Sequence, residues 1–174
     1  MTLAKLSPAW YALHTRSRFE NVVTEGLDKK KIEVFLPKIS VRSKRLDRKK
    51  IIQVPLFPGY IFVKSDLSPA HHLEIVKTAG AVRLIGTVKG PVAIPDENIE
   101  SLKIMVSSDQ EIISGTRLEA GNRILVISGP FTGVTGTFVR YKSTDRVVVY
   151  IGALGQSAAV EVNEEDIQLL PEIK

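Results

Sequence analysis

The spacing of apolar residues changes once along the chain, close to residue 106, and this change predicts two modules. Before it, strand-like apolar runs alternate with segments in which apolar residues recur every three or four positions. After Gly121, apolar residues recur at every second position between glycine-rich turns, and no helical spacing appears. The first pattern predicts an α+β sandwich domain, and the second predicts a small β-barrel.

The first module is predicted to have the element order β-α-β-β-β-α-β-α. The expected strands are residues 10–15, 32–36, 59–64 and 81–85, and a β-hairpin with a basic tip near 44–48 is expected over 38–54.

Three helices are expected between these strands. The first covers 17–27 and places Glu20 on its polar face, because apolar residues take the other face at spacings of three and four. The second begins at Ser68, a hydroxyl cap that is followed by a proline, and ends near Thr78. Asp96 is expected to cap the third.

A linker is expected between the modules, because residues 106–117 lose their periodicity and gain small polar side chains. The predicted domains are therefore 9–106 and 117–174, joined by a linker over 107–116.

The composition is that of an ordinary globular protein, with 44% hydrophobic and 25% charged residues among 174. The absence of cysteine excludes a disulfide framework and a zinc-thiolate site. No apolar run has the length of a secretory or membrane-spanning segment, so a soluble, cytoplasmic protein is expected.

The net charge of +5 is unevenly distributed. Residues 1–108 contain 18 Lys and Arg against 10 Asp and Glu, a net charge of +8, whereas residues 109–174 contain 6 against 9, a net charge of −3. This asymmetry indicates a polyanionic partner for the first module and a protein partner for the second.

Aromatic residues gather in residues 55–63, where Phe57, Tyr60 and Phe62 stand among only 11 aromatics in the chain. In a strand, Tyr60 and Phe62 share one face, and Ile61 and Val63 share the other. One face belongs to the core in any fold. Because both faces are apolar, we interpret this strand as a docking surface.

Two motifs in this order resemble the NusG/Spt5 family of transcription elongation factors. The segment 57–60 (FPGY), after Trp10-Tyr11-Ala12-Leu13, resembles its amino-terminal (NGN) domain, and the segment 129–136 (GPFTGVTG) resembles its KOW domain. The resemblance implies an NGN-type α/β sandwich followed by an SH3-like KOW barrel. It further implies a monomeric factor, without cofactor or metal, that binds RNA polymerase during elongation.

The resemblance also implies contacts for particular residues. Contacts with the clamp helices of the largest polymerase subunit fall on Trp10, Tyr11, His14, Phe57, Pro58, Tyr60 and Phe62. Contact with the gate loop of the second-largest subunit falls on His71 and His72. Upstream or non-template DNA is expected to contact Arg16, Arg18, Arg42, Lys44, Arg45, Arg48, Lys49 and Lys50.

The KOW-like module is expected to recruit a second protein through Phe131, Leu154 and Gly155, with ribosomal protein S10 or the termination factor Rho as the partners that the resemblance implies. Housekeeping members usually have Phe-Gly where this chain has Leu154-Gly155. This difference favours a specialised, operon-associated paralogue of the UpxY, LoaP or RfaH kind over a general factor.

Several alternatives remain at this point. Core packing also explains at least one of Trp10 and Tyr11, and a solvated tip explains the basic hairpin. A ribosome-associated KOW protein that binds ribosomal RNA is the main rival, but it predicts a strongly basic barrel. Catalysis is not indicated, because the three histidines and the carboxylates form no recognisable metal or nucleophile constellation.

Overall fold

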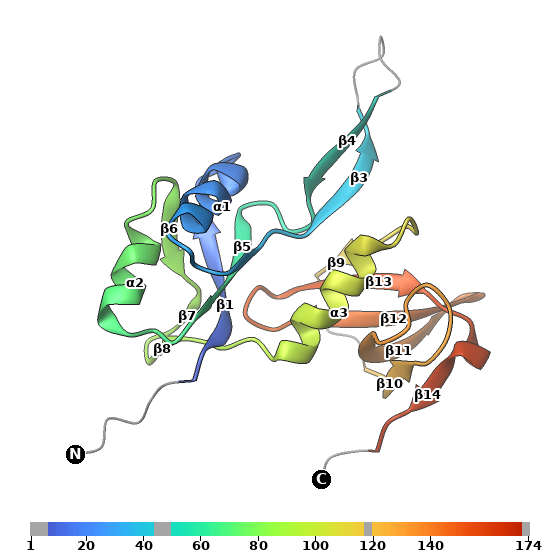
Figure 1. Ribbon diagram of the computed structural model, residues 1–174. Coiled ribbons are helices and arrows are strands. Elements are labelled where there is room, and N and C mark those ends of the chain that lie inside the picture. The colour runs from blue at the N-terminus through green and yellow to red at the C-terminus, as the bar shows by residue number, and fades with distance from the viewer. Residues whose placement is uncertain (1–6, 44–49, 117–119, 172–174) are drawn as a thin grey trace. The chain divides into compact units, whose positions relative to one another are not determined.

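The computed structural model describes residues 7–43, 50–116 and 120–171, and it divides into two compact units, Met1–Ile94 and Pro95–Lys174 (Figure 1). Each unit has its own sheet. No helix in the described part of the chain is long and apolar enough to cross a membrane.

The first unit contains a four-stranded antiparallel sheet in the order β2-β5-β1-β6. Its elements are β1 (Ala9–Thr15), α1 (Glu20–Lys29), β2 (Val34–Phe35), β3 (Lys38–Arg42), β4 (Ile51–Pro55), β5 (Tyr60–Ser65), α2 (Pro69–Val76), β6 (Ala81–Leu84), β7 (Gly86–Thr87) and β8 (Gly90–Pro91). The strands, the hairpin and the two helices that the sequence predicts here are present, and only the short β7–β8 hairpin was not expected.

The core of this unit lies between one face of the sheet and the two helices. Leu13 on β1 and Ile61 and Val63 on β5 point to this face and pack in one cluster with Val23 of α1 and Ile75 of α2. Strand alternation sends Trp10, Ala12 and Phe62 to the opposite face, where they are also buried. Both central strands are therefore apolar on both sides.

Helix starts differ in detail from the expected ones. Ser68 caps α2 as predicted, because its hydroxyl accepts the backbone N–H of His71. The first helix begins at Glu20 instead of residue 17, after Arg18 adopts a left-handed conformation with φ of 66°. The prediction that Asp96 caps the third helix is wrong. Pro95 holds the cap position, and Asp96 lies in the first turn, where its charge is favourable.

Strands β3 and β4 form a separate two-stranded ribbon that projects from the rest of the unit (Figure 1). Its tip, predicted near 44–48, lies outside the described residues. Ile51 is 69% exposed, and Ile52 is also exposed, so this part of the ribbon lacks a covering layer.

The second unit contains a six-stranded antiparallel sheet in the order β14-β10-β11-β12-β13-β9. Its elements are α3 (Asp96–Ser107), β9 (Ile113–Gly115), β10 (Asn122–Val126), β11 (Thr135–Tyr141), β12 (Thr144–Ile151), β13 (Gln156–Glu161), the 3-10 turn η1 (Glu164–Asp166) and β14 (Ile167–Leu169). Within the described residues the end strands β14 and β9 do not pair with each other, so the sheet is open where a closed barrel is predicted.

Two features of this unit differ from the sequence pattern. Strand β9 lies inside the segment expected to be a linker and pairs with β13. Helix α3, expected in the first module, packs on β11 and β12 through its buried residues Ile99, Leu102 and Met105. Ser101 fixes this packing, because its Oγ accepts the N–H of Thr135 at 2.9 Å and donates to the carbonyl of Thr135 at 3.2 Å.

Candidate functional site

The centre of the candidate docking surface is a stacked pair of rings on neighbouring strands. His14 on β1 lies directly opposite Tyr60 on β5, and their ring centroids are 5.3 Å apart with an interplanar angle of 30°. Both side chains are partly accessible, and Pro58 beside them is exposed. Thus three of the residues predicted to contact the clamp are brought together at an accessible position.

The turn that carries Tyr60 is held by the backbone of Gly59. This residue has φ of 87°, a backbone conformation that residues other than glycine rarely adopt. Its carbonyl accepts the N–H of Thr15 at 2.8 Å, and its N–H donates to Glu20 Oε1 at 2.8 Å. Tyr60 donates its own N–H to the carbonyl of Phe57. The turn is therefore tied to both β1 and α1.

Glu20 is the residue of this surface that the sequence pattern misses. Its position among polar neighbours predicts an exposed side chain, but it is only 6% exposed. The reason is the hydrogen bond to Gly59, 39 residues away, which helical spacing does not encode. The one available signal is that Glu20 opens α1, where a carboxylate is favoured by the helix dipole.

Three of the other predicted clamp residues are buried: Trp10, Phe57 and Phe62. Phe57 is 1% exposed and meets Phe62 edge to face at 6.0 Å, and Phe62 stacks on Phe35 at 6.1 Å. Trp10 is buried beneath Lys64, whose Nζ lies 6.0 Å from the ring centroid.

Tyr11 lies on the other face of the sheet from His14 and Tyr60, where it packs against the core cluster. The seven predicted clamp residues therefore occupy different environments. On the face that carries the stack, the accessible members of the set are His14, Pro58 and Tyr60, while Tyr11 is half-buried on the other face.

The two histidines predicted to contact the gate loop also have different surroundings. His71 Nδ1 is 2.6 Å from Ser65 Oγ and 3.9 Å from Asp66 Oδ1. The Ser68 N–H donates to Asp66, and this hydrogen bond lowers the pKa of the Asp66 carboxyl. His72 instead lines a hollow of about 200 Å³ together with Arg83 and the β7–β8 hairpin.

The predicted nucleic-acid contacts fall into two groups. Arg16 and Arg18 are exposed in the loop after β1, next to the turn that Thr15 binds. Arg42 and Lys50 are exposed on the ribbon. The remaining residues of this set lie outside the described part of the chain: Lys44, Arg45, Arg48 and Lys49.

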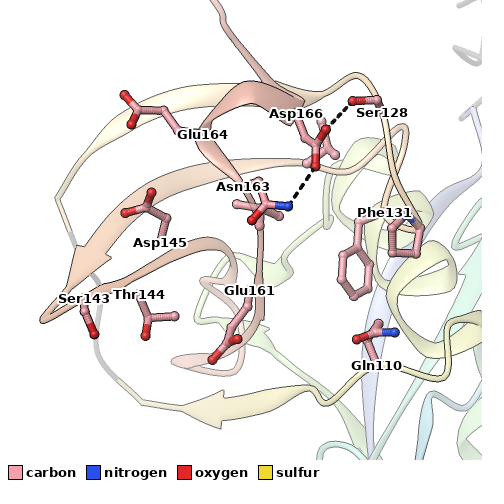
Figure 2. A pocket seen from close by; sticks show the side chains of 13 residues that line it. Gln110, Ser128, Phe131, Ser143, Thr144, Asp145, Glu161, Asn163, Glu164 and Asp166 are labelled. Carbon is pink, nitrogen blue, oxygen red and sulfur yellow. Dashed lines mark hydrogen bonds between the residues drawn. The ribbon is translucent and has the colours of Figure 1, made fainter.

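In the second unit, Phe131 forms part of the wall of a hollow of about 510 Å³ (Figure 2). Carboxylates surround this hollow. Arg140 pairs with Asp145 at 2.8 Å and with Glu164 at 3.1 Å, and the Asp145 contact raises the pKa of Arg140. Asp166 accepts a hydrogen bond from the Ser128 hydroxyl. The hollow is thus acidic and suits a basic segment better than a phosphate.

The structure does not bring all three predicted KOW contacts together. Phe131 shares its hollow with Thr144 and Asp145, at the start of β12. Leu154 and Gly155 are in the turn after the end of the same strand, where Gly155 has φ of 62°. The Phe131 hollow and the Leu154-Gly155 turn therefore lie at opposite ends of β12, a strand of eight residues.

A metal site is not found in the described residues, where no group of three or more His, Asp or Glu side chains could hold an ion.

A comparison with protein families shows which family this chain belongs to. The family model described as "Transcription termination factor nusG" matches residues 8–103, which is more than half of the chain. This chain belongs to the NusG family. The resemblance carried by the two motifs is thereby confirmed at the level of the family.

NusG-family relatives align with nearly the whole chain. The transcription termination/antitermination protein NusG of Borreliella burgdorferi is 26% identical over 94% of this chain and 99% of its own length. The protein of the same name from Thermus thermophilus is 28% identical over 91% of this chain and 96% of its own. Both modules thus have counterparts in NusG relatives.

A solved structure, "Domain interaction in Thermotoga maritima NusG", is similar in fold. It has a TM-score of 0.55 and 19% identity, and the match covers 97% of this chain and all of the other. The mixed α/β architecture is therefore shared with a NusG protein.

Proposed function

We propose that this NusG-family chain is a non-enzymatic bacterial transcription elongation and antitermination factor. Its first unit docks on RNA polymerase, and its second unit recruits another protein. The observation that carries the proposal is the His14–Tyr60 stack on a turn fixed by the buried Glu20. The names of the relatives, which are transcription termination/antitermination proteins, support the same role.

The stacked rings have the properties of a protein-docking anchor. They are partly accessible, and the turn under them is fixed by two backbone–backbone hydrogen bonds and by the bond from the Gly59 N–H to the Glu20 carboxylate, so binding costs little conformational entropy. Aromatic side chains at the centre of an interface often contribute about 2 kcal/mol or more to binding. A helical coiled-coil of the polymerase clamp is the partner that we assign to this surface.

A second contact of the first unit would reach across the polymerase cleft to the gate loop of the second-largest subunit. His71 and His72, both partly accessible, are the residues proposed for this contact, and Arg83 shares a hollow with His72. His71 supports the start of α2 through Ser65. A factor that binds both sides of the cleft holds the clamp closed and favours continued elongation.

Basic residues next to the docking surface extend the proposal to DNA. Arg16 and Arg18 lie beside the turn, and Arg42 and Lys50 lie on the ribbon. Such residues bind phosphates of upstream or non-template DNA with little sequence selectivity.

The Leu154-Gly155 turn, where housekeeping members usually have Phe-Gly, favours a specialised member of the family over a general factor.

For the second unit we propose a protein partner rather than ribosomal RNA. The net charge of −3 over residues 109–174 opposes binding to a polyanion, and the carboxylates around the Phe131 hollow fit a basic protein segment. Ribosomal protein S10 or Rho is such a partner in our proposal. The rival function, a ribosomal KOW protein, would require a basic surface here.

The test of polymerase docking is Tyr60→Ser in the full-length chain. We expect at least a tenfold loss of affinity for purified core polymerase, about 1.4 kcal/mol, because the substitution removes one ring of the stack. Leu169→Ser is the matched control, since Leu169 is an exposed apolar residue of the second unit. Unchanged affinity of a folded Tyr60→Ser protein would refute the assignment.

A further inference from the structure

The ribbon formed by β3 and β4 concentrates the positive charge of the chain. Residues 38–55 contain 7 Lys and Arg against 1 Asp, a net charge of +6, whereas the whole chain of 174 residues has a net charge of +5. In the described residues the two strands pair only with each other, and the ribbon projects from the first unit (Figure 1). A projecting element of this charge is suited to a polyanion.

The strand register gives the ribbon two different faces, because directly opposite residues of an antiparallel pair share a face. One face includes two such pairs, Ser40 with Gln53 and Arg42 with Ile51. We call these four residues the Gln53 face, and all of them are exposed. The other face carries four aliphatic side chains: Ile39, Val41, Ile52 and Val54.

The side chains of the Gln53 face are not engaged by the protein itself. In residues 7–43, 50–116 and 120–171, no hydrogen bond or ion pair joins the side chains of Ser40, Arg42 or Gln53 to another residue. Ile51, opposite Arg42, is 69% exposed although it lies among polar neighbours. The face therefore offers an amide, a guanidinium, a hydroxyl and an aliphatic group to a ligand.

These side chains are of the types that read base edges in the major groove of DNA. Glutamine forms two hydrogen bonds with adenine, arginine forms two with guanine, and an aliphatic group contacts the methyl group of thymine. The major groove is about 12 Å wide and admits a two-stranded ribbon.

The spacing of the two pairs matches the spacing of bases. Residues two apart on a strand lie about 6.8 Å apart, which equals two base-pair steps of about 3.4 Å. The Ser40–Gln53 pair and the Arg42–Ile51 pair would therefore meet base pairs that are two steps apart.

Other nucleic acids fit the ribbon less well. Proteins bind single strands by stacking the bases on aromatic side chains, and residues 38–55 contain no Phe, Tyr or Trp. Double-stranded RNA has a deep, narrow major groove that side chains do not read. Duplex DNA is therefore the ligand that matches both the charge and the side chains of the ribbon.

We propose that the Gln53 face lies in the major groove of duplex DNA and reads its sequence, with Gln53 on adenine and Arg42 on guanine. The inference rests on the DNA contact of the proposed function and deepens it, because phosphate contacts carry no direct sequence information. A factor of this kind would prefer particular upstream sequences.

The test incubates the full-length chain at low salt, where phosphate contacts are strongest, with a pool of duplexes that carry a randomised segment. Sequencing of the bound fraction gives the preferred bases. We expect adenine at one position to be enriched at least about fivefold, with guanine preferred about two base pairs away. Replacing that adenine by 7-deazaadenine, which lacks the major-groove acceptor N7, should weaken binding by a similar factor.

Two variants complete the test. Gln53→Ala should abolish the adenine preference and leave thermal unfolding unchanged, because this side chain is exposed. Lys50→Gln, which removes a proposed phosphate contact outside the Gln53 face, should weaken binding to every sequence and retain the preference.

An adenine preference that survives in Gln53→Ala, or a bound pool with the composition of the input, would overturn base reading. In the second case, binding that weakens with salt would leave the phosphate contacts of the proposed function in place. Tighter binding of single strands than of duplexes would also overturn the proposal. Because polymerase is absent, none of these results depends on docking through Tyr60.

Discussion

At the scale of single residues, Glu20 shows how a long-range contact overrides a local pattern. Helical spacing correctly predicts that Val23 and Leu27 are buried, since both share the apolar face of α1. The same spacing assigns Glu20 to solvent. It fails there because the Glu20 carboxylate accepts the N–H of Gly59. That residue lies in the turn between β4 and β5, 39 residues farther along the chain. Patterns of apolar residues identify faces of elements but not individual polar partners across the fold.

Glu20→Ala is expected to destabilise the first unit by about 1–3 kcal/mol, because it leaves the Gly59 N–H without its acceptor. The exchange rate of the Gly59 amide with deuterium measures this effect locally, and urea unfolding measures it globally. Glu25→Ala on the exposed side of the same helix is the control and should change stability by less than about 0.5 kcal/mol. Equal effects of the two substitutions would contradict the role of Glu20.

At the scale of elements, the sequence predicts which segments form strands and helices better than it predicts where those elements pack. The period-two pattern locates β10 to β13, and Ser68 with Pro69 locates α2. Strand β9 is missed because three residues are too few for a period to appear. The partner of α3 is missed because an apolar stripe indicates burial but does not identify the covering sheet.

Ser101→Ala tests the packing of α3 on β11. Ser101 is 1% exposed, and its hydroxyl pairs with both backbone groups of Thr135, so its removal leaves two polar groups unsatisfied. We expect a destabilisation of about 1–3 kcal/mol, with faster amide exchange at Thr135. Ser107→Ala, at the exposed end of the same helix, should have little effect. Unchanged exchange at Thr135 would show that the helix does not stabilise β11.

At the scale of the whole molecule, charge separates the roles proposed for the two units. The excess of positive charge is confined to residues 1–108, while residues 109–174 are acidic. This much is visible in the sequence. The structure adds that Arg16 and Arg18 are exposed in the loop that follows β1, the strand that carries His14, so the proposed docking would bring both rings and cations to their partners. That arrangement depends on the turn at Gly59, which composition does not reveal.

The paired substitution Arg16→Gln and Arg18→Gln is expected to weaken binding to an elongation complex more at low salt than at high salt. The slope of log affinity against log salt should become shallower by about 0.7–0.9 for each DNA phosphate that the variant no longer binds. Binding titrations at several salt concentrations measure this slope. Lys29→Gln, at the other end of α1, is the control. A slope that remains unchanged would exclude these arginines as phosphate ligands.

The β3–β4 ribbon has a further consequence, for divergence within the family. None of its described residues belongs to the core cluster of the first unit, and Ile51 and Ile52 are exposed. Substitutions on exposed positions usually alter stability by less than about 0.5 kcal/mol. The ribbon can therefore accumulate changes that the sheet and its helices would not tolerate. New contacts can be acquired there while the sheet and the helices of the first unit are inherited unchanged.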